Sequence, residues 1–166
     1  ANSAIIHGGY AATPGTLKAE MNALANPMWD QLAEELDFGF SRCGTYVVAI
    51  TDEQREGLKK EAAKGEANGI PVEIISGEEM RRREPNVNPE TTGALYCQVG
   101  GICDPWGATV AAAENAVMNG VTLMRRTAFE DFIWDPEDER RIIGIRTSQG
   151  DFYTRWVVNA AGLYSD

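Results

Sequence analysis

The sequence has few of the residues on which most catalytic and metal sites depend. Its 166 residues include one histidine, His7, and three cysteines, Cys43, Cys97 and Cys103. A single histidine excludes a two-histidine metal site, and no G-x-S-x-G motif is present to support a serine hydrolase. Because the cysteine count is odd and no C-x-x-C pair occurs, we expect neither a disulfide framework nor a zinc site. No metal is therefore predicted.

Glycine motifs for phosphate binding and long apolar runs are also absent. No two glycines stand two positions apart, so G-x-G-x-x-G, which holds a dinucleotide diphosphate, does not occur, and there is no P-loop. No apolar run approaches the roughly 20 residues of a membrane span, and no signal peptide is visible. A cytoplasmic location is the expectation that follows.

Positive charge is scarce. Lysine and arginine number 15 against 25 aspartate and glutamate residues, which gives a formal net charge of -10. Binding to nucleic acid needs clustered lysine and arginine, and an anionic membrane surface repels an acidic chain. We therefore expect no nucleic-acid partner, and we interpret the acidity mainly as a contribution to solubility.

Apolar spacing and capping signals predict three longer helices. Thr16 precedes an amphipathic helix that ends by Gly39, and its apolar face consists of Leu17, Met21, Leu24, Met28 and Leu32. Thr51 and Gln54 have capping-box spacing for a helix to about Asn68, which Gly69 ends. Asp104 before Pro105 predicts the start of a third helix, which runs to Gly120. A brief fourth helix follows the Ser76–Glu79 pair and ends before Pro85.

Six or seven short strands are predicted between these helices. The β-branched and aromatic runs lie at 45–50, 72–75, 93–98, 121–124, 128–134, 141–147 and 152–158, with turns at 136–139 and at Gln149-Gly150. Helices and strands do not alternate strictly. The fold class predicted is α+β, with a mixed, largely antiparallel sheet covered by helices.

The loop at 7–10 is the most unusual segment. His7 is followed by Gly8, Gly9 and Tyr10, and glycines let a backbone approach a ligand closely. A histidine in such a loop is able to bind an anion or exchange a proton near neutral pH. The residues alone leave two interpretations open, a site residue or a partly exposed loop histidine. Asp104 is interpreted as a helix cap, and the Arg81–Arg83 run as a solvated face or an anion-steering patch.

Both ends of the chain resemble cuts inside a longer protein. The sequence begins without methionine, and it stops soon after the apolar run Trp156–Val158. Natural domain ends more often pass through polar linkers. We expect the chain to be an internal part of a longer polypeptide.

Several motifs, taken in order, resemble one known family. They are Asn2-Ser3-x-x-Ile6-His7-x-Gly9, Pro14 to Ala19, Arg42 to Thr45, Glu84-Pro85-Asn86, Gly101-Ile102-x-Asp104-Pro105 and Val157 to Asp166. The set is similar to the D-amino-acid-oxidase-like FAD-dependent oxidoreductases, particularly the glycerol-3-phosphate dehydrogenase and L-2-hydroxyglutarate dehydrogenase branches. The resemblance covers nearly the whole chain, and it is more specific for the family than for the substrate.

The resemblance implies a domain map and site residues. Residues 1–15 correspond to an FAD-domain segment with the flavin-side loop, 16–120 to the substrate domain, and 121–166 to a return into the FAD-binding domain. His7 corresponds to a catalytic histidine beside the flavin. The implied cofactor-binding residues are Asn2, Ser3, Phe129, Ala160, Ala161 and Gly162.

The resemblance also implies the activity. The expected function is oxidation of glycerol 3-phosphate by hydride transfer to FAD, with a 2-hydroxy-acid such as 2-hydroxyglutarate as the alternative substrate. A non-catalytic α+β binding module is the alternative of another class, because the chain holds no complete catalytic set. The partners expected are a small-molecule substrate and the rest of its own chain, with membrane association of the complete enzyme left open. Without the diphosphate loop, this chain alone should bind FAD weakly or not at all, and its exposed apolar surface favours self-association.

Overall fold

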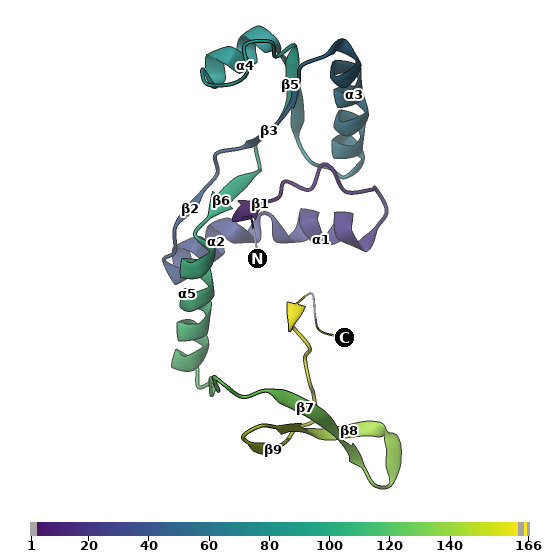
Figure 1. The fold of residues 1–166 in the computed structure, drawn as a ribbon, viewed down its shortest axis with the longest axis vertical. Helices are drawn as coiled ribbons and strands as arrows, with labels where there is room; N and C mark the ends of the chain where they lie inside the picture. Colours follow the sequence, from purple (N-terminus) through teal and green to yellow (C-terminus); the bar gives the residue numbers. More distant parts are fainter. Residues whose placement is uncertain (1–2, 163–164, 166) are drawn as a thin grey trace. The chain divides into compact units, whose positions relative to one another are not determined.

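The chain folds into two compact units, residues 1–120 and 121–166. The structure is a computed structural model that describes residues 3–162 and 165. Each unit is considered by itself (Figure 1). Every strand pairing is antiparallel, in three sheets of three strands, which confirms the predicted α+β class with largely antiparallel pairing.

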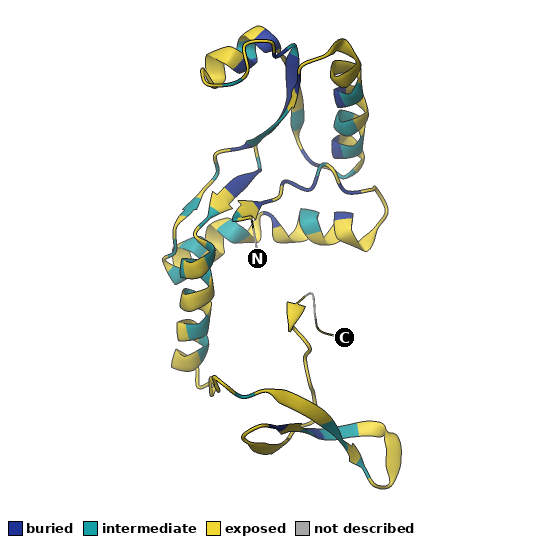
Figure 2. Ribbon diagram, viewed as in Figure 1, coloured by how far each residue is buried: buried dark blue, intermediate teal, exposed yellow. Residues whose placement is uncertain are grey.

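The largest sheet of the first unit has the order β3-β5-β4. Its strands are β3 (Thr45–Ala49), β5 (Gly93–Cys97) and β4 (Val72–Ser76), close to the predicted ranges. Alternate residues of the central strand face opposite sides, as the period of a strand requires. Leu95 packs with Ala49 and Leu58, whereas Ala94 packs with Ile75 and Met80. Figure 2 shows this strand as the most deeply buried part of the unit.

Helices cover both faces of that sheet. Helix α3 (Asp52–Ala67) supplies Leu58, and α4 (Gly77–Arg83) supplies Met80. The predicted capping box of α3 is confirmed, because the Thr51 and Gln54 side chains each bond the other's backbone N–H. At α4 only half of the predicted box forms. Ser76 Oγ accepts from the Glu79 N–H, while the Glu79 carboxylate pairs with Arg82 and Arg83.

A smaller sheet lies beside the first segment of the chain. Its order is β1-β6-β2, with β1 (Ile5–Ile6), β6 (Gly101–Cys103) and β2 (Phe40–Ser41). The sequence did not predict these short strands. Ile5 pairs with Ile102 and Ile6 with Gly101, and the His7 loop begins directly after this pairing.

The single amphipathic helix predicted from Thr16 is wrong in one respect, because it is split in two. Helix α1 (Leu17–Ala25) begins at a Thr16 cap as predicted, and α2 (Met28–Leu36) follows Pro27. Proline has no N–H to donate and crowds the preceding turn, which explains the break. Asp37, rather than Gly39, takes the left-handed conformation at the end of α2. The apolar face of Leu17, Met21, Leu24, Met28 and Leu32 is exposed.

The third long helix agrees with the prediction. Helix α5 (Pro105–Met118) has Pro105 in its first turn, and the Asp104 carboxylate accepts the Trp106 N–H. Gly120 follows with a φ of 88°, in the left-handed region that glycine tolerates. No helix among residues 3–162 is long and apolar enough to cross a membrane.

The second unit is a three-stranded antiparallel sheet with the order β7-β8-β9. Its strands are β7 (Phe129–Asp135), β8 (Asp138–Thr147) and β9 (Gly150–Tyr153). The turns at Pro136-Glu137 and Ser148-Gln149 overlap the predicted turns at 136–139 and Gln149-Gly150, but Asp138 and Gly150 already begin strands. Gly144 of β8 pairs with Tyr153 of β9, and a Cβ atom there would come 2.4 Å from the Phe152 carbonyl oxygen.

Two strand predictions in this unit are wrong. Residues 121–124 are exposed coil, and β9 ends at Tyr153 instead of continuing to Val158. Their β-branched sequence favours extended backbone, but a strand also needs a neighbour for its N–H and C=O groups. Within the described part of the chain, no strand pairs with residues 121–124, and after the bond from the Thr154 N–H to the Ile143 carbonyl oxygen none pairs with residues 155–158.

Candidate functional site

The His7 loop, residues 7–10, follows β1 directly and opens the connection to α1. His7 is exposed, while Gly8 and Gly9 on its C-terminal side are buried. No hydrogen bond to the His7 imidazole is formed by the residues that the structure describes. Within the described part of the chain, both ring nitrogens therefore remain open to a ligand.

Two glycines allow the loop to lie this close to the sheet. A Cβ atom on Gly8 would stand 2.4 Å from Cys97 Sγ, a side chain that is fully buried at the end of β5. Gly9 has a φ of 90°, which side chains disfavour. Burial raises the pKa of the Cys97 thiol, so this cysteine stays neutral and acts as a packing residue.

Two asparagine side chains hold the loop by its carbonyl groups. Asn26, at the end of α1, donates from Nδ2 to the carbonyl oxygen of His7 and to that of Val99, each at 2.9 Å. Asn68, at the end of α3, donates to the carbonyl oxygens of Gly9 at 3.1 Å and Ala12 at 2.8 Å. The carbonyl group of the histidine is thus held by Asn26, and the backbone two to five residues after it by Asn68, both distant in sequence.

Arg42 completes the network around Asn26. Its Nη1 donates to Asn26 Oδ1 at 2.8 Å, and its Nη2 donates to the Asn26 carbonyl oxygen at 2.6 Å. The guanidinium also pairs with Asp30, where this hydrogen bond lowers the pKa of the carboxyl group. It lies 5.2 Å from the centre of the Phe40 ring, within cation–π range.

Tyr10 closes the C-terminal end of the loop. Its ring packs against the core of the β3-β5-β4 sheet. Burial is the main cause that raises the pKa of its phenol, and the negative charge of Glu61 adds to it. A raised pKa keeps Tyr10 neutral at physiological pH.

An apolar groove of about 520 Å³ lies in the first unit beside the start of the chain. Ser3 and Ala4 lie at one part of its wall, and the rest comes from β1, Trp29 and the first turns of α5. The predicted cofactor residue Ser3 therefore borders a concave surface. Asn2, its predicted neighbour, lies outside the described residues.

The other predicted cofactor residues belong to the second unit. Phe129 is the first residue of β7, where it pairs with Thr147, and its half-exposed ring lies 4.9 Å from that of Phe132. Ala160, Ala161 and Gly162 are exposed, and the Ala161 N–H donates to Asn159 Oδ1. Gly162 has a φ of 83°, so the predicted turn contains the left-handed glycine that such a bend requires. The structure thus divides the predicted site residues between the two units.

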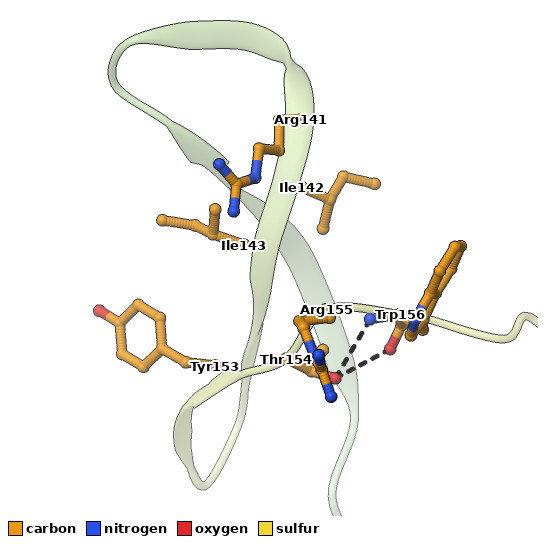
Figure 3. A pocket seen from close by; sticks show the side chains of 7 residues that line it. All are labelled: Arg141, Ile142, Ile143, Tyr153, Thr154, Arg155 and Trp156. Carbon is orange, nitrogen blue, oxygen red and sulfur yellow. Dashed lines mark hydrogen bonds between the residues drawn. The ribbon is translucent and has the colours of Figure 1, made fainter.

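The second unit also has an open hollow of about 810 Å³ between β8 and the segment after β9. Figure 3 shows Arg141, Tyr153, Arg155 and Trp156 around it, with Thr154 Oγ1 bonded to both the N–H and the carbonyl oxygen of Trp156. Trp156 is 85% exposed. Its lining, with Arg141 and Arg155, is more polar than that of the groove beside Ser3.

Neither a metal nor an anion site forms from the other polar clusters. No group of three or more metal-binding side chains occurs among residues 3–162 and 165. Arg81 donates to the carbonyl oxygens of Pro89 and Thr91, and Arg82 and Arg83 pair with Glu79. The three arginines therefore hold α4 and its neighbours in place, which leaves the anion-steering interpretation without support.

Sequence reasoning missed Asn26 and Arg42. The sequence motifs contain Arg42 only within the run Arg42 to Thr45, and the continuous helix predicted from Thr16 includes Asn26. The available signal was Pro27, because an asparagine before a proline favours a break where its amide is free to bond elsewhere.

Comparison with known proteins identifies the family. The sequence model of the FAD dependent oxidoreductase family matches residues 1–166, the whole chain. The chain belongs to the FAD-dependent oxidoreductase family.

Relatives in this family include enzymes for two kinds of substrate. A glycerol 3-phosphate dehydrogenase from Caloramator mitchellensis is 43% identical over all of the chain and 34% of its own length. An L-2-hydroxyglutarate dehydrogenase from Escherichia coli is 27% identical over 99% of the chain and 38% of its own length. The chain therefore spans little more than a third of these relatives.

Solved structures have the same fold. The L-α-glycerophosphate oxidase from Mycoplasma pneumoniae with FAD bound superposes with a TM-score of 0.77 at 28% identity, over 89% of this chain and 39% of the other. L-Proline dehydrogenase from P. horikoshii gives a TM-score of 0.82 at 25% identity, over 94% of this chain and 41% of the other. The α+β architecture is thus that of FAD-dependent oxidoreductases.

Proposed function

We propose that the complete protein is an FAD-dependent dehydrogenase that oxidises glycerol 3-phosphate. The observation that carries this proposal is the 43% identity to a glycerol 3-phosphate dehydrogenase along the entire chain. The match includes the His7 loop, whose histidine is exposed on a fixed backbone. The sequence identity and the exposed histidine together favour an enzyme in which His7 lies at the reacting end of the substrate.

The residues of this chain fit part of the cofactor. The apolar groove beside Ser3 suits a flat ring system, because such ligands are mostly buried against apolar walls with a few polar groups at the edge. The sequence has no G-x-G-x-x-G loop for the diphosphate. We therefore assign Ser3 to the ring side of FAD, and Phe129 and Ala160 to Gly162 as further contacts in the complete protein.

The chemistry assigned to this chain is proton transfer. FAD, when bound, supplies the hydride acceptor. As hydride leaves the carbon that bears the substrate hydroxyl, the O–H bond breaks and an imidazole nitrogen of His7 accepts the proton, so that the alcohol becomes a ketone. No described residue occupies the ring nitrogens of His7 with a hydrogen bond, which supports this role.

A second substrate is supported by a specific observation. The Escherichia coli L-2-hydroxyglutarate dehydrogenase matches 99% of the chain, although at 27% identity. The two substrates differ in their anionic group, a phosphate or carboxylates. The complete flavoprotein should be assayed with each substrate and an artificial electron acceptor. Faster turnover of glycerol 3-phosphate supports the proposal, faster turnover of 2-hydroxyglutarate replaces the substrate, and reduction by neither removes both.

A non-catalytic role has one observation in its favour. A mouse pyruvate dehydrogenase phosphatase regulatory subunit is 26% identical over 93% of the chain. The variant His7→Ala in the complete protein separates the two classes, because losing a general base lowers kcat by roughly 100- to 10,000-fold. Unchanged turnover with the flavin still bound would remove the catalytic role assigned to His7.

A further inference from the structure

We infer that Asn26 and Arg42 are positioning residues for His7. This inference rests on the proposed function, in which His7 accepts the substrate proton. Neither residue reaches the His7 imidazole. They act on the backbone that carries it, through the pair of carbonyl groups that Asn26 joins.

The Asn26 side chain is a buried bridge. The residue is 6% exposed, and its single NH₂ group bonds both the His7 and the Val99 carbonyl oxygens at 2.9 Å. Val99 lies in the connection between β5 and β6, 73 residues away from Asn26. The bridge therefore connects the start of the His7 loop to the turn that contains Val99. This turn lies next to the place where Gly8 packs on Cys97.

Arg42 determines which way the Asn26 amide points. A guanidinium only donates hydrogen bonds, so the side of the amide that faces Arg42 Nη1 must be the oxygen. The NH₂ group is then aimed at the two carbonyl oxygens. With the amide reversed, the NH₂ group would face the guanidinium and Oδ1 would face two acceptors. The Asn26–Arg42 pair thus has one satisfied arrangement.

Arg42 is itself held in place. Asp30 accepts from Nε at 3.2 Å as well as from Nη2, and the Asn26 carbonyl oxygen accepts a further bond from Nη2. The Arg42 side chain is 24% exposed, which makes its bonds less screened than those of a surface pair. Lysine offers one ammonium group in place of this fork and does not reproduce the set of bonds.

Position matters more than stability for a proton acceptor. Displacing a reacting group by about 1 Å is able to lower a rate by roughly 100-fold, because proton transfer needs a near-ideal donor–acceptor distance. The His7 side chain is exposed and receives no hydrogen bond from the described residues. Its backbone anchor is therefore what fixes the Cα position from which the ring reaches the substrate.

The test is a double-mutant cycle in the complete flavoprotein, with kcat measured for Asn26→Leu, His7→Ala and the double variant. In the parent, Asn26→Leu should lower kcat by roughly 10- to 100-fold with bound flavin retained. In the His7→Ala background it should lower kcat further by less than about 2-fold, since no positioned base remains. An equal loss in both backgrounds would overturn the positioning role and leave the proposed function intact.

Two further variants keep the test decisive. Asn26→Asp preserves volume and the bond with Arg42 but removes the NH₂ donors, so it repeats the cycle if Asn26→Leu does not fold. Arg42→Lys should show the same dependence on His7. A full loss of kcat in both backgrounds for either variant contradicts the inference. If His7→Ala itself keeps full turnover with flavin bound, the proposed role of His7 fails first.

Asn68→Leu is the matched control. Asn68 also joins two loop carbonyls through its Nδ2, those of Gly9 and Ala12, but it does not contact His7. Removing it should lower thermal stability about as much as Asn26→Leu does. Its effect on kcat should be the same with and without His7. A coupling to His7 as large as that of Asn26 would show a general effect of loop stability and overturn the inference.

Discussion

Replacing Gly8 with alanine tests the packing of the His7 loop directly. The added Cβ would lie 2.4 Å from Cys97 Sγ and 3.5 Å from a methyl group of Val99. Non-bonded carbon atoms prefer roughly 3.5–4.0 Å, and sulfur is larger, so the contact needs a shift of about 1 Å. Cys97 is fully buried at the end of the central strand, which leaves its side chain little room to move.

The expected cost of Gly8→Ala follows from these distances. Adding a methyl group to a well-packed site costs about 1–3 kcal/mol, whereas restricting the unfolded chain by Gly→Ala stabilises by about 0.4–1 kcal/mol. The steric cost is larger, so the net effect on the free energy of unfolding is destabilising. Gly8 does not have the left-handed φ of Gly9, so backbone strain does not add to the cost.

The relief of this clash is measured with Cys97→Ala. The two single variants and the double variant are compared by thermal and urea unfolding, followed by circular dichroism. Because Cys97→Ala removes the sulfur that Gly8→Ala would meet, the double variant should be more stable than the sum of the single effects by about 1 kcal/mol or more. Additive effects, or a Gly8→Ala variant as stable as the parent, would refute the packing described for this loop.

Three other predictions address the helix cap, the acid limb and the cofactor. Asp104→Ala should lower the free energy of unfolding by about 1 kcal/mol and Asp104→Asn by much less, since only the first removes the acceptor for the Trp106 N–H; equal losses in urea titrations would contradict the capping role. The pKa of Asp30 is lowered in the folded state by its hydrogen bond with Arg42. Its contribution to the free energy of unfolding is therefore fully present above the pKa of an unfolded aspartate, about 4, and is lost as the pH falls through the lower pKa of the folded state. Asp30→Asn should therefore flatten the acid limb of a stability–pH profile, and an unchanged limb would argue against the pair. This chain expressed alone should lose any flavin on dialysis, because it has no diphosphate loop, and a flavin absorption spectrum that survives dialysis would show the prediction to be wrong.

Local features of the fold were predictable because their physical causes lie within a few residues. The Thr51 and Gln54 side chains reach each other's backbone across one turn, and Asp104 before Pro105 starts a helix for the same reason. The positive φ of Gly69 likewise follows from its place after a helix.

Features that depend on a distant partner were not predictable in this way. Residues 121–124 have strand-like sequence and form no strand, because pairing depends on a neighbour rather than on the segment itself. In the opposite sense, Ile5–Ile6 is too short to be recognised as a strand, yet it pairs with β6 almost a hundred residues later.

The candidate site combines both kinds of information. The sequence by itself determined the family, through motifs in a fixed order, and it singled out His7 through its glycine neighbours. Only the tertiary structure decided how that histidine is held. Asn26, Arg42 and Val99 meet because two helices, a strand end and a turn come together at one place, and their hydrogen bonds join residues 16 to 73 positions apart. Spacing along the chain carries no record of such contacts, since the atoms that bond are brought together by packing of the elements between them.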